Sequence, residues 1–111
     1  MELSFTTRPL GDSTVLEVAG EIDITTAPRF RARLIEAIGN GHRSLVIDLT
    51  AVQFIDSTGL GVLIGARRRL GDSGGALSVV APPGPIRELF TATDLDGIFT
   101  IFDSLPVRTG H

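Results

Sequence analysis

The chain has 111 residues, a formal net charge of −3 and no cysteine. This length fits one domain, and an apolar share of 42% is enough for a hydrophobic core without disulfide staples. The lack of cysteine excludes disulfides and thiolate metal sites. The acidic balance argues against nucleic acid or an anionic membrane as a partner.

The sequence shows no targeting or metal-binding signal. Residues 1–5 have no basic region followed by an apolar stretch, so they do not form a signal peptide. No apolar run approaches the ~20 residues that span a bilayer. We therefore expect a cytoplasmic protein without membrane insertion. No acidic residues are paired at metal-ligand spacing, so we expect no metal and no cofactor.

The chain opens with a predicted β-hairpin. Residues 3–8 alternate between apolar and polar side chains, which indicates a strand. Gly11 and Asp12 follow as a turn signal. Residues 15–20 are rich in valine and leucine and are expected to form the second strand, antiparallel to the first.

A helix is expected after the hairpin. Thr25 or Thr26 is a suitable N-cap, and Pro28 fits the first turn, where its missing N–H costs nothing. The sequence Gly-Asn-Gly at residues 39–41 ends the helix. Its predicted apolar stripe consists of Phe30, Leu34, Ala37 and Ile38.

The rest of the chain alternates strands and helices. Strands are expected at residues 45–49, 76–81 and 98–102, and helices at residues 58–70 and 86–93. The order β-β-α-β-α-β-α-β predicts an α/β fold, with a mixed sheet of an N-terminal hairpin plus parallel strands and helices packed against it. We expect a single domain over residues 1–111, with an ordered core at about 2–102 and a loosely ordered tail at 103–111.

The candidate site is the sequence Phe-Ile-Asp-Ser-Thr-Gly-Leu-Gly at residues 54–61, where a buried strand leads into a helix. Ser57 is a candidate for the helix N-cap, and Asp56 competes for that position. First-turn N–H groups have no partners within a helix and favour an anion, so they could accept a phosphate on Ser57. Asp56 supplies negative charge nearby, and Asp23, at the end of the second strand, is expected to approach the same corner.

Two glycines and two apolar residues follow the serine. Gly59 and Gly61 each cost a helix about 0.8–1 kcal/mol relative to alanine, which indicates either close packing on the sheet or an open surface for a partner. Leu60 and Ile64 are expected to be partly exposed as a contact patch. The helix needs only one stripe for packing, expected to be Val62, Leu63, Ala66 and Leu70.

Other functions for this segment lack the necessary residues. A serine hydrolase needs a base beside Ser57, yet the only histidines are His42, in an expected turn, and His111, the last residue. Gly-x-Ser-x-Gly is absent around Ser57, and no Walker-type sequence is present. The arginines at residues 67–69 are expected to form a solvated face rather than a docking site for an acidic partner.

The residues carry a family resemblance. Val-Ile-Asp-Leu at residues 46–49, the motif at 54–61 and Gly-Glu-Ile-Asp at 20–23 together resemble STAS domains, particularly bacterial anti-sigma factor antagonists. The resemblance implies a binding module rather than an enzyme. Its unphosphorylated form would bind an anti-sigma factor that is a serine kinase and so release the sigma factor. Phosphorylation of Ser57 would break the complex, and a serine phosphatase would reset it.

The resemblance also implies which residues form the site. Ser57 is the phosphoacceptor, and Thr58 is a secondary candidate. The expected partner-binding residues are Asp23, Asp56, Thr58, Gly59, Leu60, Gly61 and Ile64. Relatives that serve in lipid-transport ATPase complexes or stress-signalling assemblies remain an alternative. The oligomeric state stays open, as does the C-terminal helix common in the family, because Pro106 interrupts the short tail.

Overall fold

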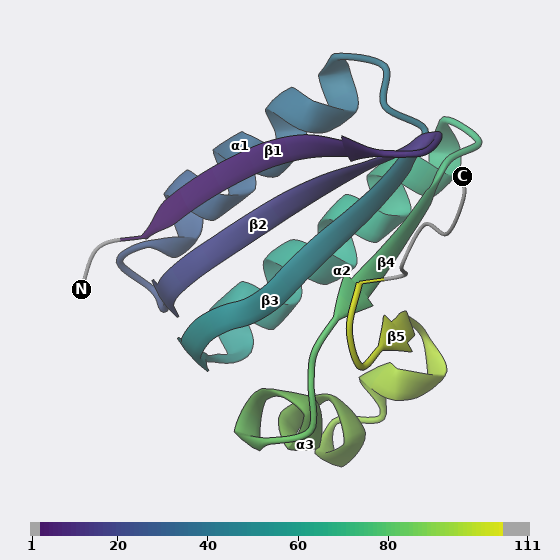
Figure 1. Cartoon of the computed structure of the whole chain (residues 1–111). Helices are drawn as coiled ribbons and strands as arrows, with labels where there is room; N and C mark the ends of the chain where they lie inside the picture. Colours follow the sequence, from purple (N-terminus) through teal and green to yellow (C-terminus); the bar gives the residue numbers. More distant parts are fainter. Residues whose placement is uncertain (1–2, 106–111) are drawn as a thin grey trace.

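The computed structural model describes residues 3–105. Its elements are β1 (Ser4–Leu10), β2 (Ser13–Ile22), α1 (Ala27–Gly39), β3 (Ser44–Ile55), α2 (Ser57–Asp72), β4 (Ala76–Val80), α3 (Pro85–Ala92), the 3-10 helix η1 (Leu95–Gly97) and β5 (Thr100–Phe102). The five strands form one sheet in the order β1-β2-β3-β4-β5. β1 is antiparallel to β2, and the other neighbours are parallel (Figure 1). The predicted α/β fold with a mixed sheet is therefore confirmed.

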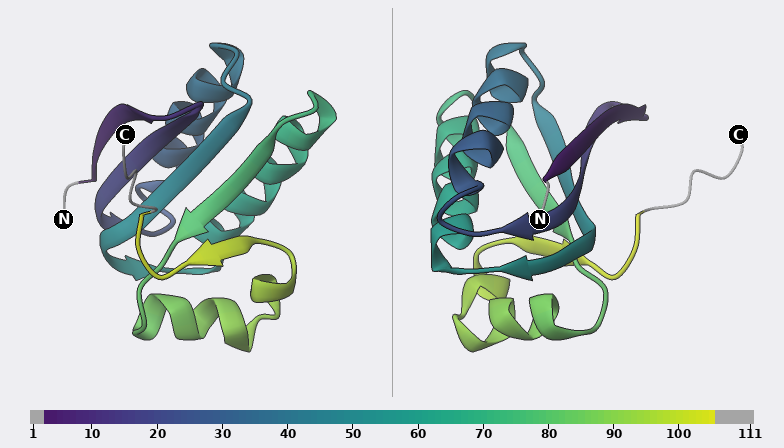
Figure 2. Two further views of the ribbon diagram at one scale, coloured as in Figure 1. Left: turned by 45° about the vertical axis from the view of Figure 1, so that its right-hand side comes forward. Right: turned by 90° about the vertical axis from the view of Figure 1, so that its left-hand side faces the viewer.

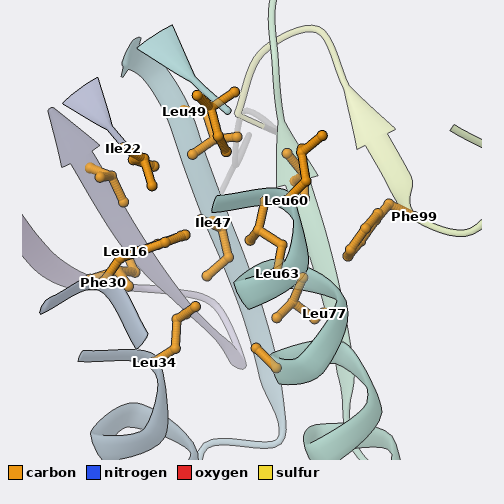
Figure 3. Packing of buried hydrophobic residues seen from close by; sticks show 14 of the residues in the cluster. Leu16, Ile22, Phe30, Leu34, Ile47, Leu49, Leu60, Leu63, Leu77 and Phe99 are labelled. Atoms are coloured by element: carbon orange, nitrogen blue, oxygen red, sulfur yellow. The ribbon is translucent and has the colours of Figure 1, made fainter. Parts of the chain in front are cut away.

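The helices form a layer on one side of the sheet. α1 and α2 lie side by side against the same face, whereas α3 lies at one end of the sheet next to β5 (Figure 2). Leucine, isoleucine, valine and phenylalanine side chains fill the space between sheet and helices (Figure 3). At the α3 end, the Phe90 and Phe99 rings meet edge to face, with centroids 5.9 Å apart. No helix of the described residues is both long and apolar enough to cross a membrane.

The strands are longer than predicted where neighbouring strands continue to pair. β2 continues past Gly20 to Ile22, and its register against β3 shifts at this glycine, which has φ of +118°. A glycine inside a strand marks such an irregularity, not its end. β3 likewise continues past Leu49 to Ile55, because its second half pairs with the second half of β2.

Other boundaries differ by one or two residues. α2 begins at Ser57 and continues to Asp72, so Gly71 does not end it. β5 is shorter than predicted, since the chain first turns through η1 and buries Phe99 in the core.

Part of the expected tail is held by contacts. Asp103 pairs with Arg87 at 2.7 Å, and Leu105 packs against a small apolar cluster on the sheet. The expectations for residues 1–2 and 106–111, including Pro106, lie outside the described residues.

Candidate functional site

Two acidic residues follow neighbouring strands at the same edge of the sheet. Ile22 of β2 is paired with Ile55 of β3, so Asp23 and Asp56 each come directly after the paired position. The backbone N–H of Asp56 donates to the Ile22 carbonyl at 3.1 Å, which ties the two strand ends together. We call Asp23, Asp56 and the first two residues of α2, Ser57 and Thr58, the acidic corner.

Asp56 caps α2. Its backbone is extended, and its Oδ1 accepts the N–H groups of Thr58 at 2.9 Å and Gly59 at 3.1 Å. The prediction of Ser57 as N-cap is therefore wrong, and Asp56, the competing candidate, holds that position. A carboxylate satisfies these N–H groups with charge-assisted bonds. A phosphate on Ser57 would have to displace Asp56 to reach them.

Asp23 organises the loop before α1. Its Oδ1 accepts the N–H groups of Thr25 at 2.9 Å and Thr26 at 3.0 Å. These hydrogen bonds, that of Thr26 foremost, lower the pKa of Asp23 below its usual value although partial burial opposes the shift. The Thr26 hydroxyl does not cap the helix as predicted, because it donates to the Glu21 carbonyl at 2.8 Å.

The start of α2 divides sharply between exposed and buried residues. Ser57, Thr58 and Gly61 are exposed, whereas Gly59 and Leu60 are buried. Leu60 is only 5% exposed and belongs to the core beneath α2 (Figure 3). The expectation that Leu60 forms a surface patch is therefore wrong.

The packing stripe of α2 differs from the predicted one for the same reason. The helix starts directly above the sheet, so Leu60 takes a place in the stripe in front of Leu63, Ala66 and Leu70. Val62, expected in the stripe, is half-buried at the side facing α1, and Ile64 is half-buried as well.

The two early glycines of α2 have different surroundings. A Cβ on Gly59 would lie 2.6 Å from Cγ2 of Ile22 and 2.7 Å from Cγ1 of Ile55, which is too close for real atoms. A Cβ on Gly61 would meet nothing within 4 Å. Close packing therefore explains Gly59, and only Gly61 lies on an open surface.

Comparison with known proteins assigns the family. The STAS domain family model matches residues 4–106. The chain belongs to the STAS domain family. It is 35% identical over 91 residues to the anti-sigma-F factor antagonist RsfB of Mycobacterium tuberculosis, which covers 82% of this chain and 74% of RsfB.

Solved structures support the same family assignment. An anti-sigma factor antagonist from Mycobacterium paratuberculosis matches this STAS domain with a TM-score of 0.87 and 31% identity, over 94% of this chain and 88% of that one. The unphosphorylated form of SpoIIAA shares the fold, with a TM-score of 0.69 and 22% identity over 92% of this chain and 90% of its own. Anti-sigma factor antagonists are regulatory binding proteins rather than enzymes, and the predicted family and general role are confirmed.

One surface residue of the STAS domain was missed by the sequence reasoning. Ile24 is 75% exposed, the largest exposure among the large hydrophobic residues of the described chain. It lies in the loop between β2 and α1, next to Asp23. Its signal in the sequence is an isoleucine that belongs neither to the strand pattern nor to the helix stripe.

The geometry also separates Ser57 from the described histidine. His42 precedes β3 and its Nδ1 lies 3.0 Å from the Thr14 hydroxyl, whereas Ser57 follows β3. This strand has 12 residues, and at about 3.3 Å per residue its two ends are far beyond hydrogen-bond reach. Among residues 3–105, no group of three or more potential ligands is placed to hold a metal ion.

Proposed function

We propose that this STAS domain is an anti-sigma factor antagonist controlled by phosphorylation of Ser57. Its unphosphorylated form binds an anti-sigma factor that is a serine kinase, and this releases the sigma factor. Ser57 carries the proposal because it is exposed at the first position of α2, within the acidic corner. The similarity to anti-sigma factor antagonists supports the partner class.

Phosphorylation acts through charge on the surface. The kinase transfers the γ-phosphoryl group of ATP to the Ser57 Oγ, the hydroxyl proton leaves, and ADP is released. The product adds about −1.5 to −2 charges beside Asp56. Because Asp56 already occupies the Thr58 and Gly59 N–H groups, the helix start does not absorb the phosphate. A partner surface that fits the serine then meets uncompensated negative charge and is rejected.

The proposed contact surface extends from the acidic corner along α2. It consists of the exposed Thr58 and Gly61 and the half-buried Asp23 and Asp56, with the half-buried Ile64 at its edge. Gly59 shapes this surface from below because it lets α2 approach the ends of β2 and β3. Leu60 supports the helix from the core and does not touch the partner. Thr58 is the secondary phosphoacceptor, and a serine phosphatase hydrolyses the phosphoserine to restore binding.

The test uses the anti-sigma factor from the same genome with ATP. We expect one phosphate on the wild type, mapped to Ser57 by mass spectrometry, and none at that site in Ser57→Ala. Thr58→Ala serves as the matched control and should retain the Ser57 label. Ser57→Asp should fold as the wild type does and bind the anti-sigma factor at least about tenfold more weakly, which titration calorimetry measures.

Two results would contradict the proposal. One is full labelling that persists in Ser57→Ala and maps outside the acidic corner. The other is a Ser57→Asp variant that binds with wild-type affinity, which would remove charge rejection as the mechanism. If the immobilised, unphosphorylated protein instead retained subunits of a lipid-transport ATPase and no anti-sigma factor, the alternative role in such a complex would be favoured.

A further inference from the structure

Two adjoining cavities lie between α1 and α2 on the outer surface of the helix layer. Their volumes are about 290 and 460 Å³, and both are lined by Arg31, Ile35, Thr58 and Val62. One continues toward Arg69, and the other continues toward Ile24. We call this continuous depression, from Ile24 to Arg69, the helix groove.

Two glycines keep one wall of the helix groove low. Gly61 and Gly65 lie one turn apart on α2, line the groove and are exposed. A Cβ at either position would meet nothing within 4 Å. Glycine lowers helix propensity, and packing inside this molecule does not require it at these positions. The glycines therefore leave the backbone of α2 open to close approach from outside.

The charge of the helix groove is opposite to that of the chain. α1 and α2 together contain six arginines against only Glu36 and Asp72, a balance of +4 in a chain of net charge −3. Arg31 and Arg69 line the groove, and no acidic residue does. Within residues 3–105, neither arginine takes part in an ion pair. Both are exposed and available to an acidic partner.

We propose that the helix groove binds an acidic amphipathic helix of the anti-sigma factor. Ile35 and Val62 receive its apolar face, and Arg31 and Arg69 bind carboxylates on its flanks. α1 has 13 residues and is about 20 Å long, which matches three to four turns of such a helix. The concave shape suits a helix better than a lipid surface.

The helix groove is continuous with the proposed switch. Thr58 lines both cavities and lies next to Ser57, so a partner in contact with the acidic corner can continue into the groove. The proposal rests on the proposed function for the identity of the partner. It adds a second contact that sets affinity independently of the charge on Ser57.

Charge reversal inside and outside the groove tests the proposal. In its unphosphorylated form, the variant Arg31→Glu with Arg69→Glu should bind the anti-sigma factor at least about tenfold more weakly than the wild type, with a smaller dependence on salt. The matched control is Arg67→Glu with Arg68→Glu, which makes the same change in net charge at exposed positions of α2 that do not line the groove. Its affinity should stay within about threefold of the wild type.

A second variant fills the groove without changing charge. Gly65→Leu should weaken binding by at least about tenfold while its thermal unfolding midpoint equals or exceeds that of the wild type, because leucine favours helix and the position is open. Circular dichroism and calorimetry on the same sample give both values. If Gly65→Leu loses folding as well as binding, the comparison of the two arginine pairs decides whether the groove is the docking site.

The possible outcomes distinguish docking in the helix groove from control by phosphorylation of Ser57. Equal weakening in both arginine pairs, or wild-type affinity in Gly65→Leu, overturns the helix groove as a docking site and leaves the Ser57 mechanism intact. No binding by the wild type overturns the proposed function and this assignment with it. Groove-dependent binding to phosphatidylglycerol vesicles, with anti-sigma factor binding unaffected, overturns the helical partner in favour of a membrane.

Discussion

Gly59 and Gly61 lie two residues apart on α2, yet they lack side chains for different physical reasons. Gly59 lies over the ends of β2 and β3, where Ile22 and Ile55 leave no room for a methyl group. Gly61 faces outward into open space. The sequence offered both explanations for both glycines and could not divide them, because the division depends on which strand ends lie under the helix.

This difference predicts opposite effects of alanine. Gly59→Ala should lower the free energy of unfolding by about 1–3 kcal/mol, because Ile22 is fully buried and cannot move away. Gly61→Ala should raise it by about 0.8–1 kcal/mol through helix propensity alone. Urea denaturation of the two variants measures both values. Changes of the same sign would show that the two sites do not differ in packing.

Ser57 and Asp56 show how far residue types alone constrain a site. The motif limited the N-cap to these two neighbours, and both have side chains that suit the role. The structure selects Asp56, whose carboxylate accepts two N–H groups. Ser57 is thereby left as an exposed hydroxyl at the first helical position, a better location for a modified residue than the cap itself.

At the scale of elements, α2 depends on its cap because its first two turns carry two glycines. Asp56→Ala should cost about 1 kcal/mol of stability, since the N–H groups of Thr58 and Gly59 lose their acceptor. Asp56→Asn keeps an acceptor oxygen and should lose much less. Thermal and urea unfolding of the two variants test this. Equal losses in both would mean that charge, and not the cap hydrogen bonds, stabilises the helix start.

The loop between β2 and α1 predicts a dependence of stability on pH. The pKa of Asp23 is lowered by the N–H groups of Thr26 and Thr25, so the folded state holds this proton less tightly than the unfolded state. The resulting stabilisation is present above the unfolded pKa of about 3.9 and is lost as the pH falls below it through the lowered folded pKa.

Asp23→Asn tests the direction of this dependence of stability on pH. The variant cannot take up the proton, so its free energy of unfolding should fall less steeply than that of the wild type between about pH 5 and pH 3. Urea titrations across that range give the two slopes. Parallel slopes would remove Asp23 as a source of acid sensitivity.

At the scale of the whole molecule, the sheet has unequal faces. The main core lies under α1 and α2, and a smaller apolar cluster of Val15, Val46 and Val80 lies apart from it, with Leu10 and Leu105 packed against it. These three valines are at most 5% exposed although they do not belong to the main core. Leu105 therefore acts as a cover that the last strand delivers to the sheet.

Removing this cover should destabilise the fold. Leu105→Ala should lower the free energy of unfolding by about 1–2 kcal/mol, a value below that of a full core truncation because Leu105 is only half-buried. The neighbouring exposed Ser104 provides the control, as Ser104→Ala should change stability by less than about 0.5 kcal/mol. Chemical denaturation measures the free energy of unfolding of both variants. Identical stabilities for the two variants would show that the second cluster contributes nothing.

The sequence alone determined the order of elements, the mixed sheet and the position of Ser57 at a strand-to-helix junction. These follow from local physics, since periodicity, turn residues and helix caps act over a few neighbours. The STAS motif extended this to the family and to the residues of the acidic corner.

Tertiary structure decided what each of those residues faces. Leu60 and Val62 exchanged their expected environments because the packing side of α2 is set by where the helix starts above the sheet, which no pattern within the helix encodes. Likewise, the helix groove exists only because α1 and α2 pack side by side, which brings Arg31 and Arg69 to one depression from positions 38 residues apart. Local sequence fixes which residues start a helix, but only the packing of one element on another determines which of them are exposed to a partner.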